Sequence, residues 1–210
     1  MRLPEQFGGA EIFWTHLDNA HRLDPSSVLS PSEVAQASRF RDETDRHRFE
    51  ARHIALRLEL GRRIGCSAHD VRIEYDEAGR PFARGLPGSF STSHSGALGV
   101  IALASRPIGV DIEHLRAGAF DGRVCAVAFS LREREWISHA PNRDEAFLQC
   151  WTRKEAAFKA LGGSMDEWVS TTVTPTAGAT GLHIENAIVT KHLILAVAAE
   201  AKSGRIVETA

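Results

Sequence analysis

The chain has 210 residues, of which 43% are hydrophobic and 25% are charged. This composition is typical of a folded globular protein and excludes disorder over the whole length. With 25 basic and 27 acidic residues the formal charge is −2, which argues against a dedicated nucleic-acid-binding protein. Apolar runs are too short to span a bilayer, and the first residues do not resemble a secretion signal, so we expect a cytoplasmic protein without a membrane anchor.

The cysteines and histidines indicate neither a disulfide framework nor a zinc site. Cys66, Cys125 and Cys150 are odd in number and form no CxxC pair, which favours free thiols in a reducing compartment. Ten histidines are present, but none belongs to an HExxH motif or a Cys/His knuckle.

The first third of the chain predicts a short strand around Trp14 and two helices. Ser30-Pro31-Ser32-Glu33 combines an N-cap, a proline in the first turn and a capping-box glutamate, so a helix should run from there to about Phe40. Apolar positions among arginines predict a second, basic helix over residues 45–64, with Gly65 as its stop.

The middle of the chain has a strand pattern. Residues 71–75 predict a strand, followed by a turn at 77–79 and an exposed Gly79-Arg80-Pro81. Residues 99–104 and 108–113 predict two neighbouring strands, which we expect to form a hairpin through Ser105-Arg106-Pro107.

The last part of the chain returns to helix and then strand. Helices are predicted over residues 130–138 and 145–161, the second closed by Gly162, and strands over 169–174, 182–189 and 192–199. Helix and strand occur in similar proportion on both sides of residues 105–108. This pattern favours an α+β fold over a doubly wound one.

Asp111 and Glu113 are unusual because they lie in an otherwise apolar strand. Side chains alternate along a strand, so both carboxylates should project from one face while Val110 and Ile112 pack behind them. Two adjacent carboxylates repel each other unless they are neutralised, and a hard divalent cation is one suitable partner. A strand with one solvated face is the alternative.

The helix over residues 145–161 carries a second acid. Leu148, Trp151, Phe158 and Leu161 predict its buried stripe, and Glu155 lies along that stripe. Glu155 and Lys159 could form an ordinary helix ion pair, worth about 0.2–0.5 kcal/mol. Alternatively, Glu155 is a third metal ligand or a base, and Lys159 faces a phosphate.

Two further groups of residues suit an anionic ligand. The polar stretch from Ser91 to Gly96 is a plausible phosphate cradle or an ordinary serine-glycine loop. A hydrolase nucleophile is less favoured, because Gly-x-Ser-x-Gly is absent and adjacent Ser93 and His94 would point apart if extended. Arg48 and Arg52, one helical turn apart, could bind a phosphate together with Arg80, or belong to a solvated helix face.

Several of these segments, taken in order, resemble one family. They are Gly79-Arg80-Pro81, Ser93-His94-Ser95, Gly109-Val110-Asp111-Ile112-Glu113, residues 129–133, and Trp151-Thr152-Arg153-Lys154-Glu155-Ala156-Ala157-Phe158-Lys159. The set resembles the 4′-phosphopantetheinyl transferases of the Sfp type, over roughly residues 30 to 165. The segments at 109–113 and 151–162 match the two signature motifs of that family.

The resemblance implies two similar α+β halves related by a pseudo-twofold, in a monomer with coenzyme A and Mg²⁺ in the cleft between them. The first half, residues 1–106, would contact the phosphates and nucleotide of coenzyme A. The second half, residues 107–210, would hold the metal site and the catalytic helix. The implied metal ligands are Asp111, Glu113 and Glu155.

The same resemblance implies roles for the basic and polar residues. Lys159 would contact the pyrophosphate, Ser93 and His94 a phosphate of coenzyme A, and Arg80 its nucleotide end. Arg48 and Arg52 are candidates for further phosphate contacts. Glu133 matches an acidic position near the site, although its spacing from Ser130 also predicts a capping box. Glu33 and Gln36 depart from the family, since some relatives have phosphate-binding lysines about there, and Ser91 replaces a frequent asparagine.

The implied reaction is a Mg²⁺-dependent transfer of 4′-phosphopantetheine from coenzyme A to a serine of an apo acyl or peptidyl carrier protein, with release of 3′,5′-ADP. Asp111, Glu155 and Lys159 would be the catalytic residues, with Glu155 as the base. Because carrier proteins are typically acidic, we expect a docking surface around residues 117–129 with Arg116, Arg123 and Arg132. A Mg²⁺-dependent phosphoanhydride hydrolase and a non-catalytic coenzyme A or carrier-binding module are the alternatives.

Overall fold

The computed structural model describes residues 3–19, 23–162, 173 and 181–201. Its fold is mixed α+β, as the sequence predicts. The helices are α1 (Pro31–Ala37), α2 (Glu43–Ile64), α3 (Gly122–Ala128), α4 (Leu131–His139) and α5 (Arg143–Leu161). The strands are β1 (Gln6–Phe7), β2 (Ala10–His16), β3 (Ile73–Tyr75), β4 (Pro81–Ala83), β5 (Ser89–Ser95), β6 (Leu98–Ala104), β7 (Ile108–His114), β8 (Leu182–Thr190) and β9 (Leu193–Glu200).

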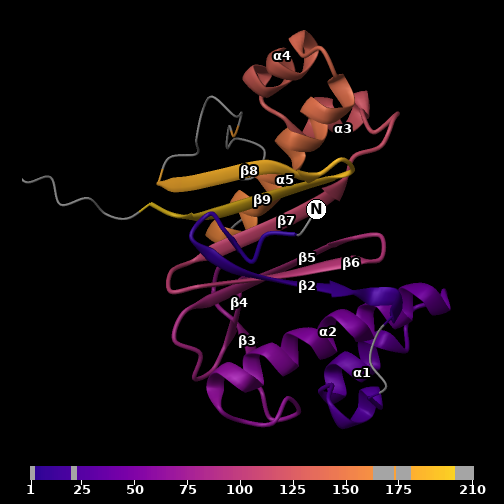
Figure 1. Cartoon of the computed structure of the whole chain (residues 1–210), viewed down its shortest axis with the longest axis vertical. Coiled ribbons are helices and arrows are strands. Elements are labelled where there is room, and N and C mark those ends of the chain that lie inside the picture. Colours follow the sequence, from indigo (N-terminus) through magenta and orange to yellow (C-terminus); the bar gives the residue numbers. More distant parts are fainter. Residues whose placement is uncertain (1–2, 20–22, 163–172, 174–180, 202–210) are drawn as a thin grey trace, which may run out of the picture.

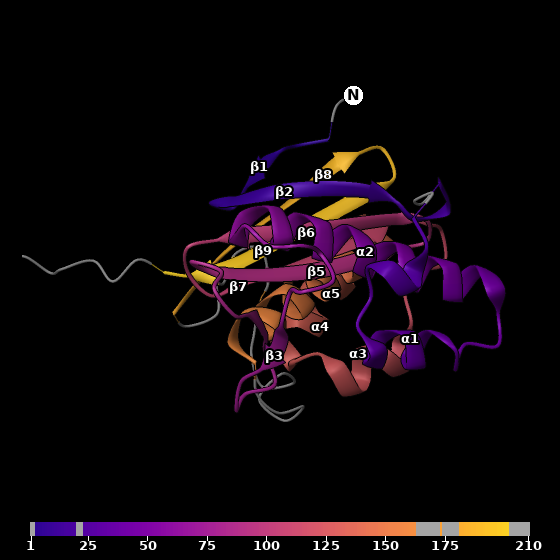
Figure 2. The ribbon, with the colours of Figure 1, turned by 90° about the horizontal axis from the view of Figure 1, so that it is seen from below.

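The strands form two antiparallel sheets that pack face to face, and a separate two-stranded ribbon. The first sheet has the order β1-β2-β6-β5 and the second the order β7-β9-β8, while β3 pairs with β4. Helix α2 covers the outer face of the first sheet and α5 that of the second, so the layers run helix, sheet, sheet, helix (Figure 1). Helices α3 and α4 lie beyond the second sheet. In Figure 2, which is seen from below, the strands of the first sheet lie in front of those of the second.

The core between the sheets follows from the period-two alternation of the strands. Ile12, Val100 and Ala102 of the first sheet meet Val110 and Ile112 of the second. Strand β9 is buried on both faces, which accounts for its continuous apolar sequence. The expected strands over residues 182–189 and 192–199 are confirmed as β8 and β9, whereas most of the one expected over 169–174 lies outside the described residues.

The predicted hairpin over residues 99–113 is wrong. Strand β6 pairs with β2 and β5, and β7 pairs with β9, so residues 105–107 cross from one sheet to the other. Strand β6 is apolar on both faces, and β7 has one apolar face formed by Ile108, Val110 and Ile112, so both strands need a covering layer as much as a neighbour at the edge. Packing β7 across the face of the first sheet meets that need, and the apolar pattern alone does not distinguish the two arrangements.

The predicted helix caps are confirmed, although α1 ends at Ala37, before the predicted Phe40. Ser30 and Glu33 form a complete capping box at α1, and Ser130 and Glu133 form another at α4. Helix α2 ends at Gly65, whose φ of 81° is the left-handed conformation that suits glycine. Among the described residues, no helix has the length and apolar character needed to cross a membrane.

Candidate functional site

The acids of β7 face α5, as the alternation predicts. Gly109 lies on the same face, and a Cβ there would overlap the carbonyl oxygen of Ala156. The absence of a side chain therefore lets α5 pack directly onto β7. With a period of two, Asp111 and Glu113 project toward α5, while Val110 and Ile112 belong to the core between the sheets.

Asp111 is almost fully buried, with 5% of its surface exposed. Its Oδ1 accepts hydrogen bonds from Ser93 Oγ and from Lys159 Nζ, both at 2.7 Å. Its Oδ2 is buried without a hydrogen-bond partner among the described residues. A buried carboxylate oxygen of this kind leaves an acceptor position for a cation or a donor group.

Glu113 lies two residues further along the same face and is partly exposed. Its Oε2 accepts a hydrogen bond from Ser95 Oγ at 3.0 Å and lies 3.6 Å from Arg116 Nη1. Glu113 therefore has one short polar contact and one longer, solvated ion pair.

Glu155 on α5 is half-buried and lies near the two acids of β7. Burial raises the pKa of its carboxyl group; the Lys159 charge lowers that pKa, and Asp111 and Glu113 raise it further. The alternative of an ion pair between Glu155 and Lys159 is not seen among the described residues, because Lys159 Nζ donates to Asp111 Oδ1 and Val110 O instead. The predicted buried stripe of α5 is also less complete than expected, because Leu161 is exposed and Phe158 is only half-buried.

The donor chemistry of Asp111, Glu113 and Glu155 fits a hard divalent cation, because all three offer carboxylate oxygens and Asp111 Oδ2 lacks a partner in the described part of the chain. Their positions are less favourable. Within the described residues, no three His, Cys, Asp or Glu side chains lie close enough to hold a metal ion. The predicted ligands therefore share one region without forming an assembled metal site.

The stretch from Ser91 to Ser95 is not a loop but part of β5, paired along its length with β6. Ser91 and Ser93 are buried, and the Ser93 hydroxyl is occupied by Asp111 and by the backbone N–H of Ile112. Because successive side chains of a strand point to opposite faces, His94 points away from Ser93 and Asp111. Its side chain is exposed. The structure therefore separates Ser93, which contacts an acid, from His94, which lies among basic groups.

His94 lies close to three cations. Loss of solvation lowers the pKa of its imidazole, and the charges of Arg52, Lys159 and Arg48 lower it further, against the opposing effect of Asp111. Among the described residues, the guanidinium of Arg52 has no hydrogen bond or ion pair, only a contact with the Phe49 ring at 5.9 Å. Arg48, by contrast, forms a two-point pair with Asp18 at 2.6 and 3.1 Å.

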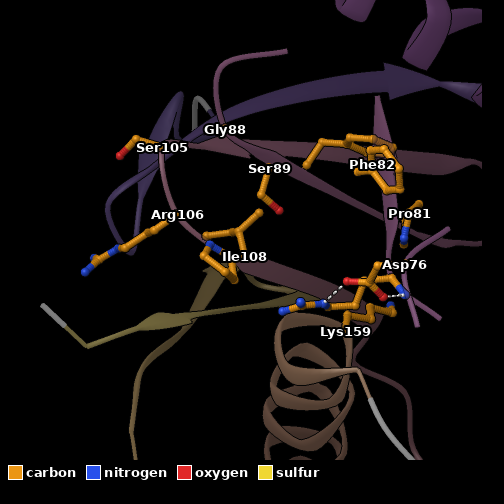
Figure 3. Close-up of a pocket in the computed structure, with 12 residues that line it drawn as sticks. Asp76, Pro81, Phe82, Gly88, Ser89, Ser105, Arg106, Ile108 and Lys159 are labelled. Atoms are coloured by element: carbon orange, nitrogen blue, oxygen red, sulfur yellow. Dashed lines mark hydrogen bonds and ion pairs between the residues drawn. The ribbon is translucent and has the colours of Figure 1, made fainter. Parts of the chain in front are cut away.

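Arg80 lies elsewhere. Its Nε donates to Asp76 Oδ2 at 2.8 Å and its Nη1 to the carbonyl oxygen of Ala160, in the last turn of α5, at 3.2 Å. It lines a cavity of about 240 Å³ where the two sheets meet. Figure 3 shows Asp76 and Lys159 at one side of this cavity and Ser105 and Arg106 at the other. Lys159 therefore borders both this cavity and the acids of β7.

Glu133 is fully buried, and its carboxylate accepts hydrogen bonds from groups of the protein itself. It accepts hydrogen bonds from Lys154 Nζ at 2.8 Å, from the Ser130 backbone N–H at 2.7 Å and from the Val173 backbone N–H at 3.0 Å. The capping box is confirmed, and the ion pair with Lys154 is a contact that sequence reasoning missed. Glu33 is similar, since it caps α1 and pairs with buried Arg57 at 2.6 Å.

A second cavity, of about 410 Å³, lies beside Glu113. Apolar side chains form much of its lining: Phe120, Val124, Phe147, Leu148 and Trp151. Arg116 also lines it, and Arg123 and Arg132 are exposed on α3 and α4. Val127 and Leu131 are 71% and 72% exposed, so this side of the molecule combines basic and apolar groups.

Comparison with known proteins identifies the family. The model of the 4′-phosphopantetheinyl transferase superfamily matches residues 107–193, which include β7 and α5. The 4′-phosphopantetheinyl transferase HetI of Nostoc is 34% identical over 164 residues, covering 73% of this chain and 68% of that protein. The 4′-phosphopantetheinyl transferase Sfp of Bacillus subtilis is 30% identical over 140 residues, covering 65% of this chain and 61% of that protein.

A third relative is similar over a shorter stretch. The 4′-phosphopantetheinyl transferase AcpT of Salmonella typhi is 39% identical over 100 residues, covering 46% of this chain and 52% of that protein. The chain thus spans between about half and two thirds of the length of these relatives. It belongs to the 4′-phosphopantetheinyl transferase superfamily, a class of transferase enzymes.

Proposed function

We propose that this protein transfers 4′-phosphopantetheine from coenzyme A to a serine of an apo carrier protein and releases 3′,5′-ADP. The observation that carries the proposal is the position of Lys159. Its ammonium group contacts Asp111, and its charge and that of Arg52 add to the loss of solvation that lowers the pKa of nearby His94. Acids and cations therefore lie side by side, as a metal-bound pyrophosphate requires.

The metal in this proposal is Mg²⁺, held by carboxylates of Asp111, Glu113 and Glu155. Bound there, it would neutralise charge that builds on the pyrophosphate as the phosphoanhydride breaks. Asp111 Oδ2, which has no hydrogen-bond partner in the described residues, supports this assignment. In the structure the ammonium group of Lys159 contacts Asp111 Oδ1. To contact the pyrophosphate of a bound substrate, this group would have to turn away from Asp111.

The protein groups divide the remaining work. Arg52 and His94 are the proposed contacts for a phosphate of coenzyme A, and Arg48 could join them only by leaving Asp18. Glu155, directly or through a water molecule on the metal, is the proposed base for the carrier serine. Lys159 would stabilise the departing 3′,5′-ADP. Ser93 and Arg80 remain candidate contacts, although both side chains have protein partners in this structure.

The carrier protein would dock against residues 117–129 together with Arg116, Arg123 and Arg132. Exposed Val127 and Leu131 and the cavity beside Glu113 support this proposal, because an acidic carrier needs both basic and apolar contacts. Charge reversal in Arg132→Glu should raise the KM for the carrier. An unchanged KM for the carrier would exclude Arg132 from the docking surface.

The experiment that tests the function is the intact mass of an apo acyl carrier and an apo peptidyl carrier after incubation with this protein, coenzyme A and Mg²⁺. A gain of one phosphopantetheine that EDTA abolishes supports transfer and its metal dependence. Cleavage of coenzyme A without a carrier product would favour the hydrolase. Binding of coenzyme A with neither reaction would favour a binding module.

A further inference from the structure

Three serines join the two sheets along one line. Ser91, Ser93 and Ser95 alternate along β5, and each hydroxyl accepts a backbone N–H of β7. Val110 donates to Ser91 at 3.1 Å, Ile112 to Ser93 at 3.4 Å, and His114 to Ser95 at 3.1 Å. Strands β5 and β7 belong to different sheets. We call this line of contacts the serine seam, since the hydroxyls do there what backbone carbonyls do within a sheet.

Two of the three hydroxyls also donate to a carboxylate. Ser93 Oγ donates to Asp111 Oδ1 at 2.7 Å, and Ser95 Oγ donates to Glu113 Oε2 at 3.0 Å. A serine hydroxyl has a single proton. Because an incoming backbone N–H occupies one acceptor position, that proton is directed at the neighbouring acid.

The pattern repeats with a period of two and stops at Ser91. In each unit, the residue before the donating N–H is the acid that accepts from the hydroxyl: Asp111 before Ile112, and Glu113 before His114. At Ser91 the corresponding residue is Gly109, which has no side chain. Ser91 therefore shares the backbone contact of the seam and lacks the contact with an acid, which makes it a natural internal control.

We propose that Ser93 and Ser95 are positioning residues, which fix the orientation of the Asp111 and Glu113 carboxylates, whereas Ser91 only joins the sheets. The proposal rests on the proposed function, because the two acids are its metal ligands. Ser95 is the more informative position. Without it, the remaining contact of Glu113 in the described residues is Arg116 at 3.6 Å, a solvent-exposed ion pair that does little to orient a carboxylate.

The test compares Ser95→Ala with Ser91→Ala. Each variant loses one backbone contact of the seam, so both should lower the melting temperature, and only Ser95→Ala also loses a contact with an acid. Binding of Mn²⁺, followed by the electron paramagnetic resonance signal of the free ion with and without coenzyme A, should weaken at least about 10-fold in Ser95→Ala, as when an outer partner of a metal ligand is removed. Ser91→Ala should bind Mn²⁺ much as the unaltered protein does.

Two further variants show whether Ser95 acts through Glu113. In a Glu113→Gln background, Ser95→Ala should cause little additional loss of Mn²⁺ affinity, because the carboxylate it orients is already gone. Ser95→Thr keeps a hydroxyl and should retain Mn²⁺ binding. If Ser95→Ala does not fold, Ser95→Cys matched with Ser91→Cys gives the same comparison, since a thiol is a weaker donor of similar size.

The outcomes separate this inference from the proposed function. Equal Mn²⁺ affinity in Ser95→Ala and Ser91→Ala would overturn the positioning role while leaving the transferase proposal standing. Full additivity with Glu113→Gln would overturn it as well. If the unaltered protein binds no Mn²⁺ with coenzyme A present and transfers nothing to a carrier, the metal site fails and the inference with it.

Discussion

Lys154 and Lys159 lie on the same helix, α5, and each pairs with a carboxylate, yet the two ion pairs differ in burial and in hydrogen bonding. Lys154 and its partner Glu133 are both fully buried, and both oxygens of Glu133 accept hydrogen bonds. Lys159 is partly exposed, and its partner Asp111 keeps one buried oxygen without a hydrogen bond in the described residues.

The difference shows which part of α5 is structural and which is suited to a ligand. A buried pair in which both carboxylate oxygens already accept hydrogen bonds is poorly suited to bind a ligand, and it fixes α4 against α5. A pair with an unfilled oxygen, next to Glu113 and half-buried Glu155, carries excess negative charge. That charge is costly in the free protein and useful only when a cation or a polar ligand arrives.

The largest effect on stability should come from breaking the buried pair. Lys154→Ala leaves the buried Glu133 carboxyl group without its cation, and removal of one partner of such a pair costs about 3–5 kcal/mol. Urea unfolding followed by circular dichroism measures the loss. Lys154→Met is the matched control for side-chain volume. A loss below about 1 kcal/mol, the usual value for an exposed pair, would mean that the two ion pairs do not differ as the structure indicates.

The second prediction concerns Asp111, the partner of Lys159. Asp111→Asn should reduce transfer on the order of 10²–10³-fold, the cost of removing one preorganised electrostatic group from an active site. Its free energy of unfolding should not fall, because the change removes a buried carboxylate, one oxygen of which has no hydrogen-bond partner in the described part of the chain. Steady-state transfer and urea unfolding are measured on the same preparation. Destabilisation comparable to that of Lys154→Ala would show that Asp111 is chiefly structural.

Gly109 tests whether the close approach of α5 to β7 holds the site together. In Gly109→Ala the new Cβ would overlap the Ala156 carbonyl and press on the Ala160 nitrogen, so α5 must shift. Such overpacking costs about 1–3 kcal/mol. Thermal unfolding measures this cost, and transfer should fall further than stability alone explains because Glu155 and Lys159 move with the helix. Wild-type stability and activity together would show that α5 has room to move.

Sequence reasoning predicted the local features well. The capping boxes at Ser30 and Ser130 and the end of α2 at Gly65 depend on residues within one helical turn. The shared face of Asp111 and Glu113 likewise follows from the period of a strand. These features require no knowledge of what lies across the fold.

Contacts between distant segments could not be predicted in the same way. The sequence permits Lys159 to pair with Glu155 one turn away or with Asp111 on β7. In the folded protein α5 packs on β7, and Lys159 pairs with Asp111. Similarly, nothing in the polar run of β5 indicates that its serines bond to the backbone of β7, because both the pairing and the seam depend on how two sheets meet. The ion pair of Glu133 with Lys154 was missed for the same reason.

The last and smallest predicted effect concerns the reactivity of Cys150, which reports on the buried side of α5. Cys150 lies one turn before Lys154, and burial raises the pKa of its thiol to about 12. Burial also raises the pKa of Cys125, whereas Cys66 is exposed. Because the thiolate is the reactive form, a disulfide reagent at pH 8 should modify one thiol rapidly in the folded protein and all three after unfolding.

The variant Cys66→Ser should abolish the rapid phase, which assigns it to that residue. Cys150 should become reactive in Lys154→Ala in proportion to the unfolded population, since opening of α5 exposes both positions together. In Asp111→Asn it should stay protected, because Asp111 lies on β7 and contacts α5 through Lys159, away from the buried pair of Lys154 and Glu133. Rapid labelling of Cys150 in the unaltered protein would mean that the buried side of α5 opens readily, and the contrast between its two lysines would then be one of degree.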